Sequence, residues 1–137
     1  MKKEFFPGVL LLMLLLTSLV ACNSAEGANW QEVAGLKGIA KTFIDRDSIR
    51  KSQGNIAGAW AKISFSEPVQ IEDQQLVEEI NYYEFKCGTS QYRVLESTYS
   101  YKSGKTERIA SGGMKSWKNI NKESTRAIYE HLCKGRR

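Results

Sequence analysis

The chain has 137 residues and a formal net charge of +5, and 42% of its residues are hydrophobic. This length suits one domain with one modest core, and no internal repeat is visible. Charge is uneven, because residues 22–101 carry eight basic and eleven acidic side chains whereas residues 102–137 carry ten and three. The basic end is suited to anionic lipids, glycans or acidic proteins, but a solvated face that maintains solubility is the simpler interpretation.

The first residues have the layout of a secretory signal. Lys2 and Lys3 precede an apolar run at 8–20, which is too short and wrongly flanked for a membrane span. The run ends in Leu-Val-Ala-Cys, not in an ordinary small-x-small cleavage site. We therefore expect a signal peptide at 1–21, a small, polar, flexible tether at 22–29 and a single domain at 30–137. Export removes the chain from the cytoplasm, so nucleic acid is not an expected partner.

The stretch that ends in Cys22 resembles the lipobox of bacterial lipoproteins. In that class the cysteine sulfur receives a diacylglyceryl group, cleavage occurs just before it, and the new amine is often acylated too. Each buried methylene contributes about 0.8 kcal/mol, so one acyl chain anchors only marginally whereas several hold a protein on a membrane. Asn23, where inner-membrane lipoproteins commonly carry Asp, favours the outer membrane. The alternative is an ordinary signal peptide that leaves Cys22 as a free thiol.

Most of the domain shows the period-two alternation of β-strands. Pro68 is expected to end a strand, so the acidic stretch 67–79 is interpreted as a solvent loop or ragged edge. The pattern predicts an antiparallel meander of about five or six strands. Its recognisable strands lie at 38–45, 56–65, 80–87, 92–101 and 106–110, with polar turns at 52–55 and 102–105.

The C-terminal segment changes to a helical period and makes the fold class α+β. Asn121 is the expected N-cap, and Gly135 is expected to close the helix. A helix this short is marginal alone in water, so it needs a surface to pack on. Its apolar stripe consists of Thr125, Ile128, Tyr129, Leu132 and Cys133.

Two cysteines lie on apolar faces of the predicted elements. Cys87 belongs to a strand and Cys133 to the helical stripe, so a disulfide between them would pin the helix to one face of the sheet. Closing the loop between Cys87 and Cys133 contributes roughly 4 kcal/mol to the stability of the fold in the chain-entropy model. If Cys22 is lipidated, this pairing also accounts for the odd number of cysteines. The alternatives are two buried thiols or a zinc site, for which His131 and two cysteines are too few ligands.

The sequence favours a protein that is not an enzyme, and we expect no catalytic residues, no cofactor and no metal. Gly104-Lys105-Thr106 matches only the end of a phosphate-binding loop, because Tyr99 stands where its first glycine belongs. The glycine pair at 112–113 is too short to indicate a phosphate-binding loop. Asp45 and Asp47 are expected together on the polar end of a strand.

Aromatic side chains are the remaining candidates for binding. Exposed tyrosines beside lysines would suit a protein-binding surface, because tyrosine gives a large contact area at a low entropy cost. Half-buried, the same tyrosines would be ordinary cross-strand pairs, and this is the simpler interpretation. The candidates are Tyr82, Tyr92, Tyr99 and Tyr101, with Lys102 and Lys105.

An ordered set of short segments from Trp30 to Cys133 resembles the surface-adhesin protein E family of bacterial lipoproteins. One departure is visible, because NKES at 121–124 stands where the family often has Pro-Gly-Ser before the last helix, so only Ser124 matches. The segments are the opening Trp30, FIDRDSI at 43–49, GNIAGAWAK at 54–62, YYEFKC at 82–87, YRVLESTYSYKSGK at 92–105, Trp117 and the helix that ends at Cys133.

The resemblance implies an antiparallel sheet whose last helix is held on one face by the disulfide. It also implies a membrane-anchored, adhesin-like binding module that contacts host matrix or serum proteins and can form a homodimer. Strand edges at 56–65 or 92–101 are candidates for pairing in such a dimer. The competing function is that of an accessory or envelope-maintenance lipoprotein that faces the periplasm and has a protein partner.

Overall fold

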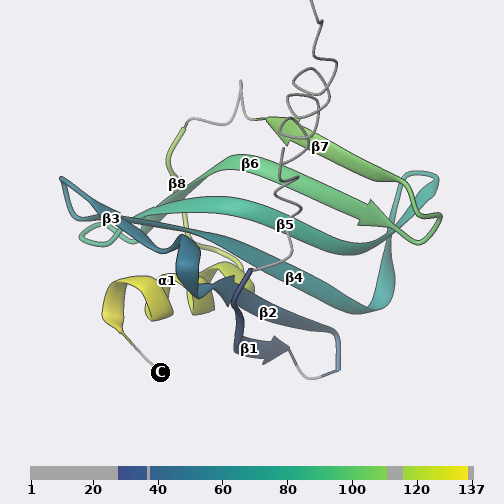
Figure 1. Ribbon diagram of the computed structural model, residues 1–137, viewed down its shortest axis with the longest axis horizontal. Coiled ribbons are helices and arrows are strands. Elements are labelled where there is room, and N and C mark those ends of the chain that lie inside the picture. Colours follow the sequence, from purple (N-terminus) through teal and green to yellow (C-terminus); the bar gives the residue numbers. More distant parts are fainter. Residues whose placement is uncertain (1–27, 37, 111–115, 136–137) are drawn as a thin grey trace, which may run out of the picture.

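The computed structural model describes residues 28–36, 38–110 and 116–135. The predicted signal peptide, Cys22, most of the tether and the glycine pair at 112–113 lie outside these residues. Within them, strands form one antiparallel sheet, and an α-helix packs against it (Figure 1). The strands are β1 (Trp30–Leu36), β2 (Ala40–Asp45), β3 (Arg50–Ser52), β4 (Ile56–Ile71), β5 (Gln74–Lys86), β6 (Gln91–Tyr101), β7 (Thr106–Ala110) and β8 (Lys118–Asn119); the helices are the 3-10 turn η1 (Arg46–Ser48) and α1 (Glu123–Lys134).

The sheet is a meander with the order β1-β2-β4-β5-β6-β7. All neighbours on this path are antiparallel, and the short strands β3 and β8 add to β4 and β6. The five strands predicted from the alternation are confirmed as β2, β4, β5, β6 and β7. The predicted α+β class is therefore confirmed, with β1, β3 and β8 as elements that the period did not indicate.

The long hairpin of β4 and β5 overturns the predicted loop at 67–79. β4 continues to Ile71 and β5 begins at Gln74, so the two strands remain paired up to a turn at Glu72, whose φ is 52°. Pro68 lies where the register of β4 and β5 shifts, between Ser64 and Val69. A strand tolerates proline at such an irregularity because no ladder amide is required there.

Both strands proposed to be free edges lie inside the sheet. β4 pairs with β2, β3 and β5, and β6 pairs with β5, β7 and β8. The prediction that residues 56–65 or 92–101 offer an edge to a second copy is therefore wrong. The homodimer itself stays a prediction, and among the described residues β1 and β7 are the strands at the two ends of the main path of the sheet.

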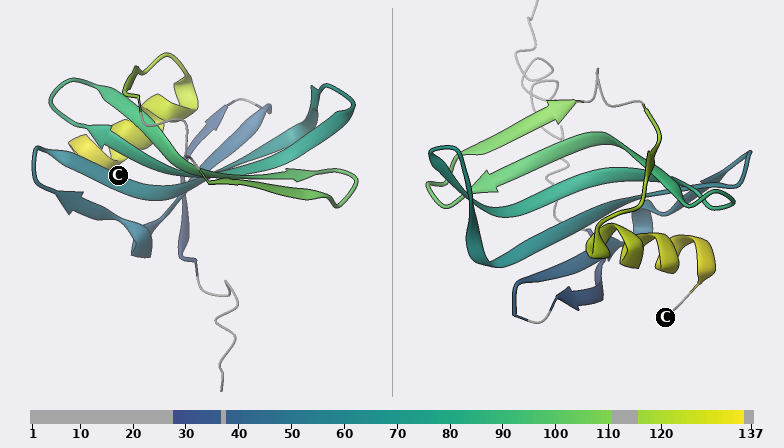
Figure 2. Two further views of the ribbon diagram at one scale, coloured as in Figure 1. Left: turned by 90° about the horizontal axis from the view of Figure 1, so that it is seen from above. Right: turned by 180° about the vertical axis from the view of Figure 1, so that it is seen from behind.

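The core lies between α1 and one face of the sheet. Phe85 of β5 and Ile128 of α1 are fully buried, and small alanines of β4 let the helix approach the strands. The right panel of Figure 2 shows α1 and β8 in front of this face. The predicted helical stripe is confirmed by the buried residues Thr125, Ile128, Tyr129 and Leu132.

The two ends of α1 differ in how they are closed. Gly135 adopts the left-handed conformation at φ 62°, and its amide donates to the carbonyl of Glu130, so the predicted C-terminal stop is confirmed. The predicted N-cap is wrong, because Lys122 occupies that position and makes no side-chain hydrogen bond to the first turn. The helix start is therefore left without a capping side chain.

The predicted disulfide joins Cys87, just after β5, to Cys133 near the end of α1, with 5.3 Å between their Cα atoms. Beside it, the Tyr129 hydroxyl donates to the carbonyl of Cys87 at 2.9 Å and lies 3.0 Å from the Ser90 hydroxyl. The last turns of α1 are thus fastened to the sheet by one covalent bond and by hydrogen bonds to the turn after β5.

Replacing both cysteines, in the variant Cys87→Ser with Cys133→Ser, should lower the free energy of unfolding by roughly 4 kcal/mol, because the unfolded chain is no longer constrained. Urea unfolding followed by far-UV circular dichroism measures this change. A reductant should destabilise the natural protein and leave the double variant unchanged. Equal stability of the two proteins under oxidising conditions would contradict the structural role of the bond.

Candidate functional site

The sheet has one face under α1 and one face, here called the outer face, that α1 does not cover. Along β5, Tyr83 and Phe85 belong to the core under the helix. Their neighbours Tyr82, Glu84 and Lys86 consequently lie on the outer face, because successive side chains of a strand point to opposite sides. All three are only partly buried.

All three tryptophans of the chain belong to the outer face. Trp60 of β4 is the cross-strand partner of Tyr82, and their ring centroids lie 5.3 Å apart in an edge-to-face arrangement. The ammonium of Lys62 lies 4.8 Å from the ring centroid of Trp30 and 5.2 Å from that of Phe43. Trp30 and Phe43 thus form one aromatic cluster around a cation, and the Trp60–Tyr82 pair lies on the same face of the neighbouring strands.

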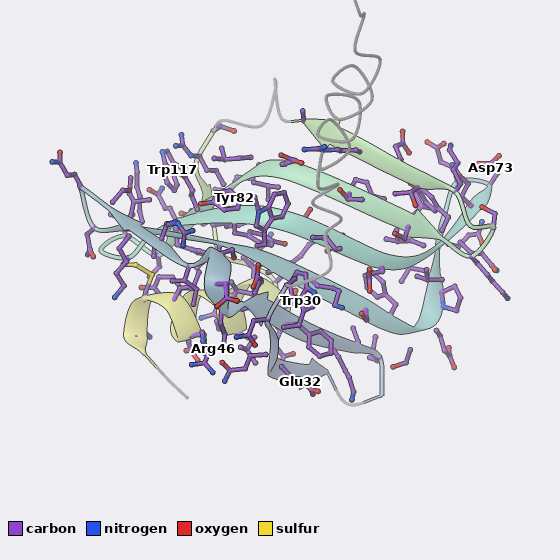
Figure 3. All side chains as sticks on the ribbon, viewed as in Figure 1. Trp30, Glu32, Arg46, Asp73, Tyr82 and Trp117 are labelled. Carbon is purple, nitrogen blue, oxygen red and sulfur yellow. A yellow bond between two sulfur atoms is a disulfide. The ribbon has the colours of Figure 1, made fainter. Side chains whose placement is uncertain are left out.

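A second aromatic cluster surrounds Trp117, which lies just before β8. Its ring centroid is 4.5 Å from the Lys86 ammonium and 4.6 Å from the Arg93 guanidinium carbon. In Figure 3, Trp117 and Tyr82 lie towards the end of the sheet where β8 joins, and Trp30 lies beside β1 and β2. The outer face therefore carries half-buried aromatic rings interleaved with basic groups over much of its length.

Ion pairs between neighbouring strands fix the basic groups of this face. Arg93 contacts Glu84 at 2.6 Å, and Lys62 lies 3.9 Å from Glu78. Surface ion pairs contribute about 0–1 kcal/mol each, so we expect these partly exposed pairs to orient the side chains more than they stabilise the sheet. The Arg108 guanidinium of β7 makes a similar pair with Glu96.

Gly58 makes room for the ring of Tyr82. A Cβ atom at this position would lie 2.8 Å from the Tyr82 hydroxyl oxygen and 3.3 Å from the carbonyl oxygen of Tyr83. The tyrosine thus lies across the backbone of β4 where a side chain is absent. This glycine keeps Tyr82 against the sheet beside Trp60.

The structure divides the predicted tyrosine and lysine candidates between the two sides of the sheet. Tyr82 lies on the outer face, and its contact with Trp60 is a half-buried cross-strand pair. Tyr92 packs against Phe85 and the core, and Tyr99 lines a cavity on the same side. Tyr101 is buried there as well, while Lys102 and Lys105 are exposed at the turn between β6 and β7. These six residues do not form one continuous surface.

A polar cavity of about 180 Å³ lies between the sheet and the start of α1. Strands β5 and β6 supply its floor, β8 and the residues around it supply one wall, and the first turn of the helix supplies another. The sequence analysis did not single out this site. Its chemically distinctive lining residues are Glu79, Asn81, Tyr83, Lys118, Lys122 and Thr125.

The floor of the cavity holds polar groups in a partly buried setting. Asn81 is 4% exposed, and its Nδ2 donates to the Tyr83 hydroxyl at 3.1 Å. Its Oδ1 has no hydrogen-bond partner in the part of the chain that the structure describes. Burial raises the pKa of the Glu79 carboxyl above its ordinary value, and the charge of Lys122 opposes that rise. Burial and the nearby Glu79 also raise the pKa of Tyr83.

The residues considered for catalysis have structural partners or isolated positions. Asp45 Oδ1 accepts from the amides of Asn29 at 3.0 Å and Asp47 at 3.2 Å, so it caps η1 and holds the start of β1. Asp47 lies in η1 and not on a strand end, contrary to the prediction. His131 lies partly buried on α1.

The described residues were expected to hold no metal, and they contain no membrane-spanning helix. No group of three or more His, Cys, Asp or Glu side chains in this part of the chain is placed to hold a metal ion. The described helices also include none with the length and apolar character needed to cross a membrane.

Residues 30–134 match the family model of the surface-adhesin protein E family. The chain belongs to this family. The match begins at the first residue of β1 and ends at the last residue of α1, so it spans every element of the fold. No curated protein sequence matches the chain.

Solved structures of Haemophilus influenzae protein E are similar to this fold. One has a TM-score of 0.51 at 11% identity, covering 77% of this chain and 84% of that one. Its selenomethionine form has a TM-score of 0.50 at 12% identity, covering 75% and 85%. At such low identity the likeness concerns the backbone fold.

Gly58→Ala should destabilise the protein by about 1–3 kcal/mol, because the new methyl group displaces the ring of Tyr82. Urea unfolding measures the loss. The same substitution in a Tyr82→Phe background should cost less, since the closest contact, with the hydroxyl oxygen, is then absent. Equal costs in both backgrounds would mean that Tyr82 is not what Gly58 accommodates.

Glu79→Gln should stabilise the protein at pH 7 and have little effect at acid pH. Because the folded-state pKa of Glu79 is raised, the native protein loses stability as pH rises through the interval between the unfolded and folded pKa values. Glutamine does not ionise and avoids this loss. Urea unfolding at several pH values tests the sign, with the exposed Glu67→Gln as the control that should follow the natural protein at every pH.

Proposed function

We propose that this protein is a lipidated, adhesin-like surface module that binds host or other extracellular proteins without catalysing a reaction. Its membership of the surface-adhesin protein E family supports the adhesin-like role. The lipobox-like stretch before Cys22 supports an anchor in the outer membrane. In this proposal residues 1–21 are removed, residues 22–29 form the tether, and residues 30–137 form the binding domain.

The outer face is the surface that we propose makes the contact, and its aromatic clusters carry the proposal. Tryptophan, tyrosine and arginine are the residues that most often dominate the energy of protein interfaces. Here Trp60, Trp117 and Tyr82 are half-buried, so they lose little side-chain entropy when a partner covers them. The cations that lie against the rings favour a partner with apolar groups flanked by carboxylates.

The side chains of this face suit protein binding better than catalysis. Its carboxylates Glu78 and Glu84 are engaged by Lys62 and Arg93, so neither is arranged as a free acid or base. A non-catalytic role is also the one that the family description indicates.

Protease shaving of intact cells tests the location on which the proposal depends. A domain outside the outer membrane should be digested while a known periplasmic protein survives as the leakage control. If the domain is cut only after the outer membrane is opened, the adhesin role fails, and the alternative of a periplasm-facing accessory lipoprotein takes its place.

Cys22→Ser should abolish incorporation of radiolabelled palmitate and release the protein from the membrane fraction.

Binding of the purified protein to a panel of immobilised matrix and serum proteins tests the surface. Trp117→Ala should weaken the binding of any partner found by at least about tenfold, since interface tryptophans often contribute more than 1.4 kcal/mol. The control Ile109→Ala removes an exposed apolar side chain from β7, outside the aromatic clusters. Equal losses of affinity in both variants would show that the partner does not bind at the outer face.

A further inference from the structure

We infer that the cavity between the sheet and the start of α1 binds a small zwitterion with one ammonium and one carboxylate group, of the class of free α-amino acids. This site lies on the side of the sheet opposite the outer face. It does not depend on the proposed protein-binding surface, and the two meet at Arg93, which lines the cavity and also contacts Trp117.

The floor of the cavity contains a buried hydrogen-bond acceptor, the side-chain oxygen of Asn81. The Oδ1 atom of Asn81 is buried with no hydrogen-bond partner among the described residues, while the other end of its amide is fixed by the Tyr83 hydroxyl. Burial without a partner is uncommon in native proteins and calls for a group that is absent from the chain itself. A ligand N–H would supply it.

The negative charge of the Glu79 carboxylate favours a donor that carries a positive charge. Glu79 precedes Asn81 by two residues on β5, so both side chains face the cavity from the same side of the strand. Glu79 is opposite Tyr99 and Asn81 is opposite Ser97 across the β5–β6 pairing, so hydroxyl groups stand beside both. A carboxylate, an amide oxygen and hydroxyl oxygens together form a set of acceptors that suits an ammonium group.

The opposite wall of the cavity has the reverse polarity. Ser124 and Thr125 line it from the first turn of α1, a 12-residue helix whose N-cap residue, Lys122, makes no capping hydrogen bond. The first amides of a helix have no partner within the helix and carry its positive dipole end. Together with the ammonium of Lys122, they would hold a carboxylate.

The size of the cavity limits what can span the two ends. Its volume of about 180 Å³ is below the roughly 300–1,000 Å³ of pockets for drug-sized ligands. A small molecule with its two charges a few bonds apart would satisfy acceptors at the floor and donors at the helix start at once. An amine or a carboxylic acid alone would satisfy one end only.

Isothermal titration of the purified protein with the common amino acids tests this inference. At least one amino acid should bind, and it should bind at least about tenfold more tightly than either the amine that lacks its carboxylate or the acid that lacks its ammonium. The inference is overturned if no amino acid binds at millimolar concentrations, or if one of the half-molecules binds as tightly as the zwitterion.

Variants locate the binding. Glu79→Gln should weaken it at least about tenfold, because the charge that holds the ammonium is lost. The matched control Glu67→Gln makes the same change on the exposed part of β4 and should leave the affinity unchanged. Lys122→Met should also weaken binding, because the ammonium that holds the ligand carboxylate is lost, and it should leave the packing of the hydrophobic core unchanged. If Glu79→Gln and Glu67→Gln bind equally well, the ligand occupies another place and the inference fails.

Discussion

The covalent attachment of α1 to the sheet is the constraint on which the remaining structure depends. A 12-residue helix is marginal by itself, and the bond between Cys87 and Cys133 fastens it at its C-terminal end. Once held there, α1 lays Ile128 and Leu132 over the alanines of β4 and closes the core. The same attachment places the first turn of the helix over the polar groups of β5 and leaves the other face of the sheet uncovered by α1.

Alternation along the strands gives the two sides of one sheet different chemistry. The residues that face α1 pass from apolar near the disulfide to polar near the helix start, where Glu79 and Asn81 lie. The outer face instead carries aromatic rings, as at Trp60, and basic groups held by cross-strand ion pairs. A protein partner and a small polar ligand would therefore meet separate surfaces.

Local patterns predicted the elements well and their extent and contacts less well. The helical spacing of Ile128 and its neighbours is a property of adjacent residues, so it was visible in the sequence. The length of the β4–β5 hairpin was not visible in the sequence. Pro68 and the acidic residues around it are typical of a loop, and the extended conformation there is stabilised by pairing with the partner strand. Alternation alone separates Tyr82 from Tyr83. The grouping of Trp30 with Lys62 depends on strand order, which no local period reveals.

The position of the three tryptophans makes their intrinsic fluorescence a probe of the outer face. Trp30, Trp60 and Trp117 all belong to the outer face, and the described lining of the polar cavity contains tyrosines but no tryptophan. Emission excited at the red edge of the indole band therefore arises from one side of the molecule. A macromolecule that covers this side changes the polarity around all three indoles and shifts their spectrum, whereas a ligand in the cavity would lie near Trp117 alone, through Arg93.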